Sequence, residues 1–298
     1  MKVAIAGASG LVGRALTAAL RGAGHDVRRL VRRGAVAADE IAWNPPTGEI
    51  DTVQLEGSDA IVNLAGENLA AGRWTAARRE RILRSRTEST RTLVAAIGKL
   101  ARKPEALLNA SAVGFYGDRG DEVLTERSGI GQGFLPEVCL AWETHAEGAR
   151  RVGVRTVCLR FATILAREGG ALAKMLPVFR LGLGGRFGDG RQWMSWVSSD
   201  DMVGAIRHAL GEARCAGPIN VAAPAPVTNA EFAATLGRVL RRPVVLPLPS
   251  WVLCAVFGQM ANEALLASTR AVPDRLRETG FVFRHRTLES ALRSALEK

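Results

Sequence analysis

The 298-residue chain is poor in several residue types that carry chemistry in proteins. It holds one tyrosine, four cysteines and four histidines. The cysteines form no CxxC pair and no histidine lies near them at metal-ligand spacing, so we expect neither a metal site nor a disulfide framework. The histidines show neither an HExxH motif nor the spacing of a catalytic triad, which leaves them as structural or surface residues.

Long apolar runs are also missing. The longest run near the C-terminal end, Trp251 to Phe257, is too short to cross a membrane. The apolar start of the chain is interrupted by glycines and Arg14, so it does not form the apolar core of a signal peptide. The sequence therefore predicts a cytoplasmic protein that has no membrane as a partner.

Lysine is scarce, because only five of the 40 basic residues are lysines. With 29 acidic residues the formal net charge is +11, and arginine carries nearly all of the excess. The arginines are scattered and no nucleic-acid-binding module is recognised, so we expect no nucleic acid as a partner. A hydrophobic content of 47% with 23% charged residues indicates a substantial core in one compact unit or two lobes.

The first residues of the chain predict a buried strand, a glycine-spaced turn and a helix, an order typical of a dinucleotide site. Gly7 would let the chain turn sharply off the strand, Gly10 would let the backbone approach a pyrophosphate, and Gly13 would let the helix pack close to the sheet. The N-terminus of the helix would then face the phosphates. The cofactor contacts predicted from this turn are Gly7, Ala8, Ser9, Gly10, Leu11, Val12 and Gly13.

The second predicted strand, residues 27–31, ends at Arg32 and Arg33. An NAD enzyme usually carries an acidic residue at this point, where it binds the ribose hydroxyls. A guanidinium group suits a 2′-phosphate instead, so we predict NADP(H) as the cofactor and consider NAD(H) less favoured. The alternative is that both arginines are solvated charges at the end of a strand.

Further predicted strands alternate with helices, which indicates an α/β fold with a doubly wound parallel sheet of the Rossmann type. The strands are expected over residues 60–64, 106–110, 154–161 and 217–221, and the helices over 75–100, 137–151 and from Asp200 onward. We expect a Rossmann lobe of residues 1–168, completed by about 195–223. A smaller, mixed and mainly helical substrate lobe is expected from residues 169–194 and 224–298.

The order of these motifs resembles the extended short-chain dehydrogenase/reductase superfamily. The glycine turn resembles its cofactor loop, Ser111 its catalytic serine, and Asp200 with Asp201 its late aspartate motif. The chain is most similar to an atypical family related to NAD-dependent epimerases and dehydratases, of unassigned function and with a C-terminal helical extension. The segments that carry this narrower resemblance are residues 63–66, 73–75, 111–114, 182–185, 190–196 and 242–292.

The resemblance implies a departure at the catalytic centre. In the superfamily a tyrosine exchanges a proton with the substrate oxygen, and a lysine one helical turn later lowers the pKa of that tyrosine. Here Gly120 stands four residues after Tyr116, and the expected helix carries Leu135 and Cys139 at the positions of the pair. Arg86 aligns where the superfamily usually carries an asparagine. Leu64, Ala65, Gly66, Arg86, Ala110 and Arg160 are the further residues predicted to contact the cofactor.

Three residues are candidates for a catalytic role. Ser111 would hydrogen-bond a substrate carbonyl or hydroxyl, or it simply caps a strand end. Tyr116 would be a general acid that stands away from the usual position of the catalytic tyrosine, or it would be an aromatic residue that lines the pocket. Cys139 lies one helical turn from Glu143 and could approach the nicotinamide, although a buried inert cysteine is the alternative.

Glu67, Arg186, Arg191 and Trp193 are predicted to bind a small-molecule substrate, and the two guanidinium groups would select an anionic one. A contact between lobes is the alternative for the last three. The predicted function is an NADP(H)-dependent oxidoreductase or epimerase-like enzyme that acts on a small carbonyl or alcohol. The alternative is a nicotinamide-nucleotide-binding sensor or scaffold without catalysis, and we expect a monomer or a homodimer.

Overall fold

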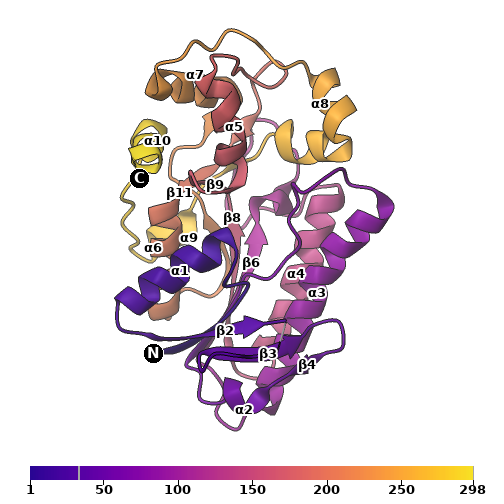
Figure 1. The fold of residues 1–298 in the computed structure, drawn as a ribbon, viewed down its shortest axis with the longest axis vertical. Coiled ribbons are helices and arrows are strands. Elements are labelled where there is room, and N and C mark those ends of the chain that lie inside the picture. The colour runs from indigo at the N-terminus through magenta and orange to yellow at the C-terminus, as the bar shows by residue number, and fades with distance from the viewer. Residues whose placement is uncertain (33, 298) are drawn as a thin grey trace.

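The computed structural model of the chain describes residues 1–32 and 34–297, and a parallel sheet forms its centre (Figure 1). Eight described strands build this sheet, in the order β12-β8-β6-β5-β1-β2-β3-β4. Among the described strands of this sheet, only β3 and β4 pair antiparallel, so the predicted doubly wound sheet is confirmed. The strands are β1 (Lys2–Ala6), β2 (Asp26–Val31), β3 (Glu40–Asn44), β4 (Glu49–Ile50), β5 (Ala60–Asn63), β6 (Ala106–Ala112), β8 (Arg155–Phe161) and β12 (Gly217–Val221).

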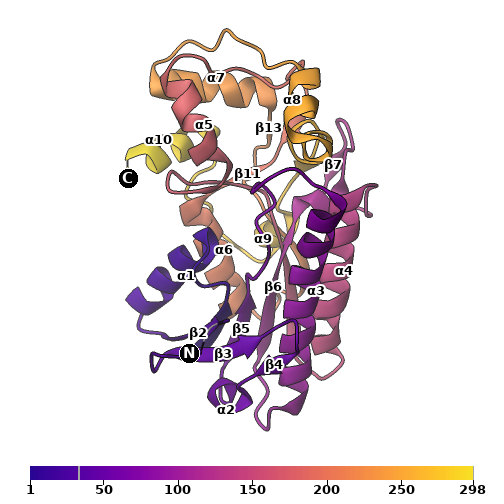
Figure 2. The same cartoon turned by 45° about the vertical axis from the view of Figure 1, so that its right-hand side comes forward.

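Helices cover both faces of the sheet (Figure 2). Because side chains alternate along a strand, Val3 and Ile5 of β1 pack into one core while Ala4 and Ala6 pack into the other. The first core is closed by α1 (Leu11–Gly22), α6 (Ser199–Gly211) and α9 (Asp274–Glu278). The second is closed mainly by α3 (Ala76–Lys99), α4 (Phe134–Arg150) and α2 (Thr52–Leu55).

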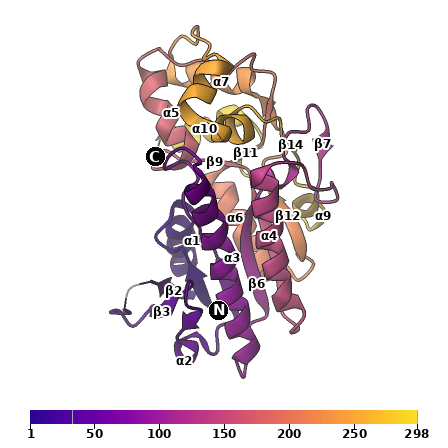
Figure 3. The same ribbon diagram turned by 90° about the vertical axis from the view of Figure 1, so that its right-hand side faces the viewer.

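A separate core lies at the other end of the molecule, where α5, α7 and α10 gather (Figure 3). Trp196 and Phe232 are fully buried in it. The elements outside the main sheet are η1 (Val113–Tyr116), β7 (Val123–Leu124), β9 (Thr163–Leu165), α5 (Gly170–Arg180), β10 (Trp193–Met194), β11 (Trp196–Ser198), β13 (Val227–Thr228), α7 (Asn229–Leu240), α8 (Ser250–Phe257), η2 (Ala261–Leu265), β14 (Arg270–Ala271) and α10 (Leu288–Glu297). The residue bounds of the two predicted lobes stay a prediction.

Two predicted element boundaries were wrong, and three elements were not predicted. The strand expected over residues 106–110, with Ser111 at its end, continues to Ala112, so Ser111 lies inside β6. The helix expected from residue 137 begins at Phe134, because Pro136 is tolerated in a first helical turn, where its missing N–H has no partner to lose. Between residues 40 and 55 the chain forms two strands and a short helix that the sequence pattern did not indicate.

Candidate functional site

The glycine turn lies where the strand order reverses, between the carboxyl ends of β1 and β5. Gly7 has a φ of +77°, and a Cβ there would come within 2.7 Å of the Leu64 carbonyl carbon. A Cβ on Gly13 would come within 2.2 Å of the Gly7 oxygen. Only glycine fits these two positions, and in open α/β sheets this crevice is where ligands bind.

The turn leads directly into the N-terminus of α1. Ser9 and Gly10 are exposed, Ala8 is buried, and Leu11 and Val12 are partly buried. Among the described residues no side chain caps this helix, and its first turn holds no acidic residue. The first N–H groups of a helix have no partner within it, so they can bind an anion.

Arg32 follows β2 at the same edge of the sheet. It is exposed and forms no ion pair with any residue that the structure describes, whereas Arg33 lies outside the described residues. Arg29, on the same strand, forms an ion pair with Asp39 instead, and its Nε lies 2.8 Å from Asp39 Oδ2. That hydrogen bond lowers the pKa of Asp39 to about 2. Arg32 is therefore the strand-end guanidinium left available to a ligand.

Three adjacent strands bring the predicted Ser111 beside residues distant in sequence. Ser111 of β6 is in register with Arg160 of β8, and Arg160 is in register with Asn220 of β12. Paired residues of neighbouring strands point to the same face, so these side chains lie in a row. Glu143 of helix α4 lies against this row.

Glu143 joins the row through two partners. The Ser111 hydroxyl donates a 2.6 Å hydrogen bond to Glu143 Oε1. Arg160 donates to Oε1 from Nε and to Oε2 from Nη2, both at 2.8 Å. Burial opposes the charge on Arg160, but the bonds and charge of Glu143 outweigh it and raise the pKa of the guanidinium above its usual value.

The single tyrosine, Tyr116, is fully buried at the end of η1. Its hydroxyl donates to Asn220 Oδ1 at 2.8 Å and accepts from Arg160 Nη1 at 3.0 Å. Arg160 also lies over Phe115, with Cζ 3.5 Å from the ring centroid. Burial raises the pKa of the phenol, so Tyr116 is held neutral.

Cys139 lies next to this cluster and is buried. Its Sγ is 3.8 Å from the oxygen of Ala112. Burial, aided by the charge of Glu143, raises the pKa of the thiol to about 11. A thiol with this pKa is protonated at neutral pH, and the reactive form of cysteine is the thiolate.

Arg86 is a buried cation, with 8% of its surface exposed. Its guanidinium donates to the carbonyl oxygens of Ile82 at 3.0 Å and Glu67 at 3.2 Å, and Cζ lies 5.0 Å from the Trp142 ring. It forms no ion pair within the described residues. Desolvation lowers the pKa of Arg86 to about 10, and the charge of Glu67 opposes this shift only in part. The burial of this cation therefore costs free energy that no ion pair within the described residues recovers.

The loop after β5 lies between the glycine turn and Arg86. Leu64 donates its N–H to the oxygen of Ala6 at 2.9 Å, and the N–H of Ala65 donates to Asn63 Oδ1 at 3.2 Å. A side chain on Gly66 would contact Arg86 Cζ at 3.2 Å. The predicted Ala110 lies in β6 and is buried.

The predicted substrate residues occupy different surroundings. Arg186 and Arg191 are exposed, and their guanidinium groups form no ion pair in the part of the chain described. The backbone N–H of Arg191 donates to Asp189 Oδ1 at 3.0 Å. Trp193 donates its indole N–H to Asp121 Oδ1 at 2.7 Å. Glu67 Oε1 lies 3.3 Å from Arg78.

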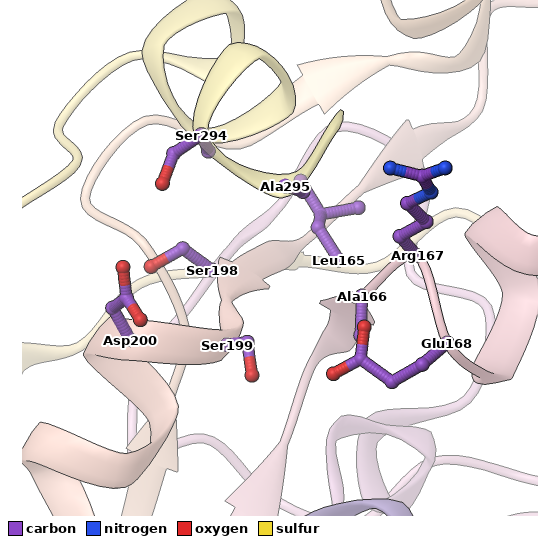
Figure 4. A pocket seen from close by; sticks show the side chains of 10 residues that line it. Leu165, Ala166, Arg167, Glu168, Ser198, Ser199, Asp200, Ser294 and Ala295 are labelled. Carbon is purple, nitrogen blue, oxygen red and sulfur yellow. The ribbon is translucent and has the colours of Figure 1, made fainter. Parts of the chain in front are cut away.

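A cavity of about 530 Å³ lies between β9, the start of α6 and α10 (Figure 4). Its volume is typical of a small-molecule site. None of the predicted site residues lines it. Gly169 follows the lining residue Glu168, and a Cβ on Gly169 would lie 3.2 Å from Leu11 Cδ1 at the start of α1. The lining residues are Leu165, Ala166, Arg167, Glu168, Ser198, Ser199, Asp200, Ala291, Ser294 and Ala295.

Within residues 1–32 and 34–297, no group of three or more histidine, cysteine, aspartate or glutamate side chains could hold a metal ion. No helix in those ranges combines the length and apolarity needed to span a membrane.

The strand order and the glycine turn at its reversal point define a Rossmann-type α/β protein. The family model described as "NAD dependent epimerase/dehydratase family" matches residues 3–222, and the chain belongs to this family. A second model, a domain of unknown function named DUF1731, matches residues 248–295. The resemblance predicted from the motifs, including the C-terminal extension, is therefore confirmed.

Relatives extend over nearly the whole chain. The epimerase family protein Mb2239 of Mycobacterium bovis is 46% identical over 97% of this chain and 96% of its own length. The crystal structure of human epimerase family protein SDR39U1 (isoform2) with NADPH superposes with a TM-score of 0.91, at 36% identity, over 100% of this chain and 99% of that one. A nucleoside-diphosphate sugar epimerase from Corynebacterium glutamicum matches with a TM-score of 0.81 and 36% identity, covering 99% of this chain and 58% of that one.

Proposed function

We propose that the protein binds NADP(H) and acts as an oxidoreductase or epimerase-like enzyme on a small carbonyl or alcohol substrate. The observation that carries the proposal is the glycine turn, since side chains at Gly7 and Gly13 would collide with backbone at the sheet's reversal point. Family membership and the NADPH in the human SDR39U1 crystal structure support the same cofactor.

The residues present fit this cofactor. The turn and the uncapped first N–H groups of α1 would hold the pyrophosphate, and Arg32, aided by Arg33, would bind the 2′-phosphate. Leu64, Ala65 and Gly66 would present backbone to the nucleotide. When bound, the nicotinamide supplies hydride transfer to or from a carbon atom.

Ser111 and Glu143 are the pair we propose for handling the proton. Because the Ser111 hydroxyl donates to Glu143 Oε1, its oxygen is free to accept a hydrogen bond from a substrate hydroxyl. As an alcohol is oxidised, its proton would pass to Ser111 Oγ while the serine proton passes to Glu143 Oε1, and reduction reverses both transfers. Arg160 would fix the carboxylate in place throughout.

Tyr116 and Cys139 are assigned positioning and packing roles in this proposal. Both bonds of the Tyr116 hydroxyl are committed to Asn220 and Arg160, and burial raises the pKa values of the phenol and of the Cys139 thiol. Neither group is therefore suited to accept a substrate proton at neutral pH.

A second candidate function is nucleotide binding without turnover. It is favoured by the missing tyrosine and lysine pair, because Leu135 and Cys139 stand where that pair is expected on α4. The substrate lobe, with Arg186, Arg191 and Trp193, would then form an interaction surface that reports the bound nucleotide.

Calorimetric titration with NADPH and NADH tests the cofactor, and bound NADPH fluorescence against a library of carbonyl compounds tests turnover. The double variant Arg32→Ala/Arg33→Ala should weaken NADPH more than NADH, while Arg81→Ala on the exposed face of α3 should change neither. Equal losses for both nucleotides would reject the 2′-phosphate assignment. Tight binding with no oxidation by any compound would favour the second candidate, and no binding would reject both.

A further inference from the structure

Two neighbouring segments of the chain lie at the end of the molecule opposite α2 (Figures 1 and 2), and both carry exposed apolar residues. Residues 181–188 follow α5, and residues 241–249 join α7 to α8. The N–H of Leu248 donates to the oxygen of Arg186 at 2.8 Å, so the segments run side by side. We call the exposed large apolar residues of these two segments and of α8 the apolar tip. Their exposed fractions are 74% for Leu181, 55% for Leu183, 69% for Val245, 52% for Leu246, 73% for Trp251 and 53% for Val256.

Helix α8 shows that this exposure is unusual. Its sequence, SWVLCAVF, contains no charged residue, yet Leu253 is its one buried side chain. A helix that is apolar on every side is normally buried. Several large apolar side chains exposed at one end of a folded protein indicate a site that another surface covers.

The charge around the apolar tip indicates what covers it. No acidic residue occurs between Glu168 and Asp189, or between Glu231 and Glu263. Four arginines in these stretches are exposed and form no ion pair with the described residues: Arg180, Arg186, Arg241 and Arg242. A fifth arginine in these stretches, Arg238, has its Nη1 3.9 Å from Glu289 Oε2.

We propose that the apolar tip docks onto an anionic membrane surface. Exposed tryptophan and leucine side chains bury well at the boundary between headgroups and acyl chains, while arginines around them bind lipid phosphates. A second copy of the chain is a poorer occupant, because two tips would bring eight unpaired arginines together. The proposal revises the expectation that no membrane is a partner, and it concerns the membrane surface only.

Co-sedimentation of the full chain with vesicles tests the proposal, using phosphatidylcholine alone and phosphatidylcholine mixed with anionic phosphatidylglycerol. Trp251→Ser removes the largest exposed apolar group, and Arg180→Gln/Arg241→Gln removes two unpaired charges. Val53→Ser on α2, with Val53 83% exposed, and Arg81→Gln/Arg91→Gln on α3 are the matched controls. NADPH titration and thermal melting of each variant establish that it remains folded.

We expect binding to the anionic vesicles that weakens with added salt. Trp251→Ser should reduce the partition coefficient about tenfold, the tip arginine pair should reduce it about twentyfold, and the controls should leave it within about twofold. Lack of binding to the anionic vesicles at low salt would overturn the proposal, as would equal losses in tip and control variants. Self-association of the wild type that Trp251→Ser abolishes, seen by sedimentation velocity, would replace the membrane with a second copy.

Discussion

The Ser111 hydroxyl donates a 2.6 Å hydrogen bond to Glu143, linking the central sheet to a helix 32 residues further along the chain. Arg160 reaches the same carboxylate from the neighbouring strand with two hydrogen bonds. The direction of the Ser111 O–H bond is thus set by the fold before any ligand binds. A hydroxyl oriented in advance pays less ordering entropy when a substrate arrives.

The ion pair between Glu143 and Arg160 should be required for stability. Glu143→Gln leaves the Arg160 guanidinium, whose side chain is 4% exposed, without a counter-charge. We expect the free energy of unfolding in urea to fall by about 3–5 kcal/mol. The matched control is Glu147→Gln on the same helix, because Glu147 pairs with Arg150 at 3.7 Å where both side chains are exposed, and its loss should stay below about 1 kcal/mol. Equal losses would show that the buried pair has no special role.

The glycine turn should tolerate no side chain at its third glycine. In Gly13→Ala the new methyl group would meet the Gly7 oxygen at 2.2 Å, so the helix must move away from the turn. We expect NADPH affinity by calorimetry to fall at least about tenfold, with a loss of stability of about 1–3 kcal/mol. Gly98→Ala in α3 is the control, since its Cβ meets nothing within 4 Å, and it should stabilise the protein by up to about 1 kcal/mol. A Gly13→Ala variant that binds NADPH normally would contradict the site.

Features that depend on local pattern could be predicted from the sequence. The strand, turn and helix around Gly7 and Gly13 follow from a short apolar run and glycine spacing, and they were found as predicted. The Gly217–Val221 strand was also placed correctly, because its ends are marked by Gly217 and by the loop that follows. Such signals need no knowledge of distant residues.

The buried network around Ser111 could not be predicted in the same way. Its bonds depend on the register of three strands, and Tyr116 lies 104 residues from its partner Asn220. One signal was present: Arg160 follows the buried apolar run of residues 157–159 within β8, and a buried charge requires a partner. The sequence does not say which carboxylate supplies that partner, since Glu143 is contributed by a helix.

Cys139 should resist alkylation until high pH. Its folded pKa of about 11 lies above the ordinary value of 9.0, so the thiol contributes stability that is complete below pH 9 and lost as the pH rises toward 11. Iodoacetamide labelling followed by mass spectrometry should modify the partly buried Cys254 first, with Cys139 reacting only well above pH 9. A Cys254→Ser variant isolates the slower reaction. Rapid labelling of Cys139 at neutral pH would show a thiolate and restore its candidacy as a catalytic group.

Arg86 and Arg160 should respond in opposite ways to loss of charge, although both are buried. Arg160→Met leaves the Glu143 carboxylate without its ion-pair partner. Arg86→Met leaves no carboxylate among the described residues without an ion-pair partner. It removes a cation whose pKa is already lowered to about 10 by burial. We expect Arg160→Met to cost about 3–5 kcal/mol of unfolding free energy, and Arg86→Met to change it by less than about 2 kcal/mol, mainly through the carbonyls of Ile82 and Glu67.

Replacing Arg86 should reduce the function of the protein more than its stability. A cation kept in a buried position without a carboxylate partner is expected to serve a ligand, because function is where proteins retain unfavourable charges. Arg86→Met should therefore weaken NADPH binding or lower turnover at least about tenfold while the urea midpoint changes little. Paired urea unfolding and NADPH titrations of the two methionine variants provide the measurement. If Arg86→Met instead unfolds as readily as Arg160→Met and its folded fraction binds NADPH with unchanged affinity, then Arg86 holds helix α3 to the loop at Gly66 and has no role at the site.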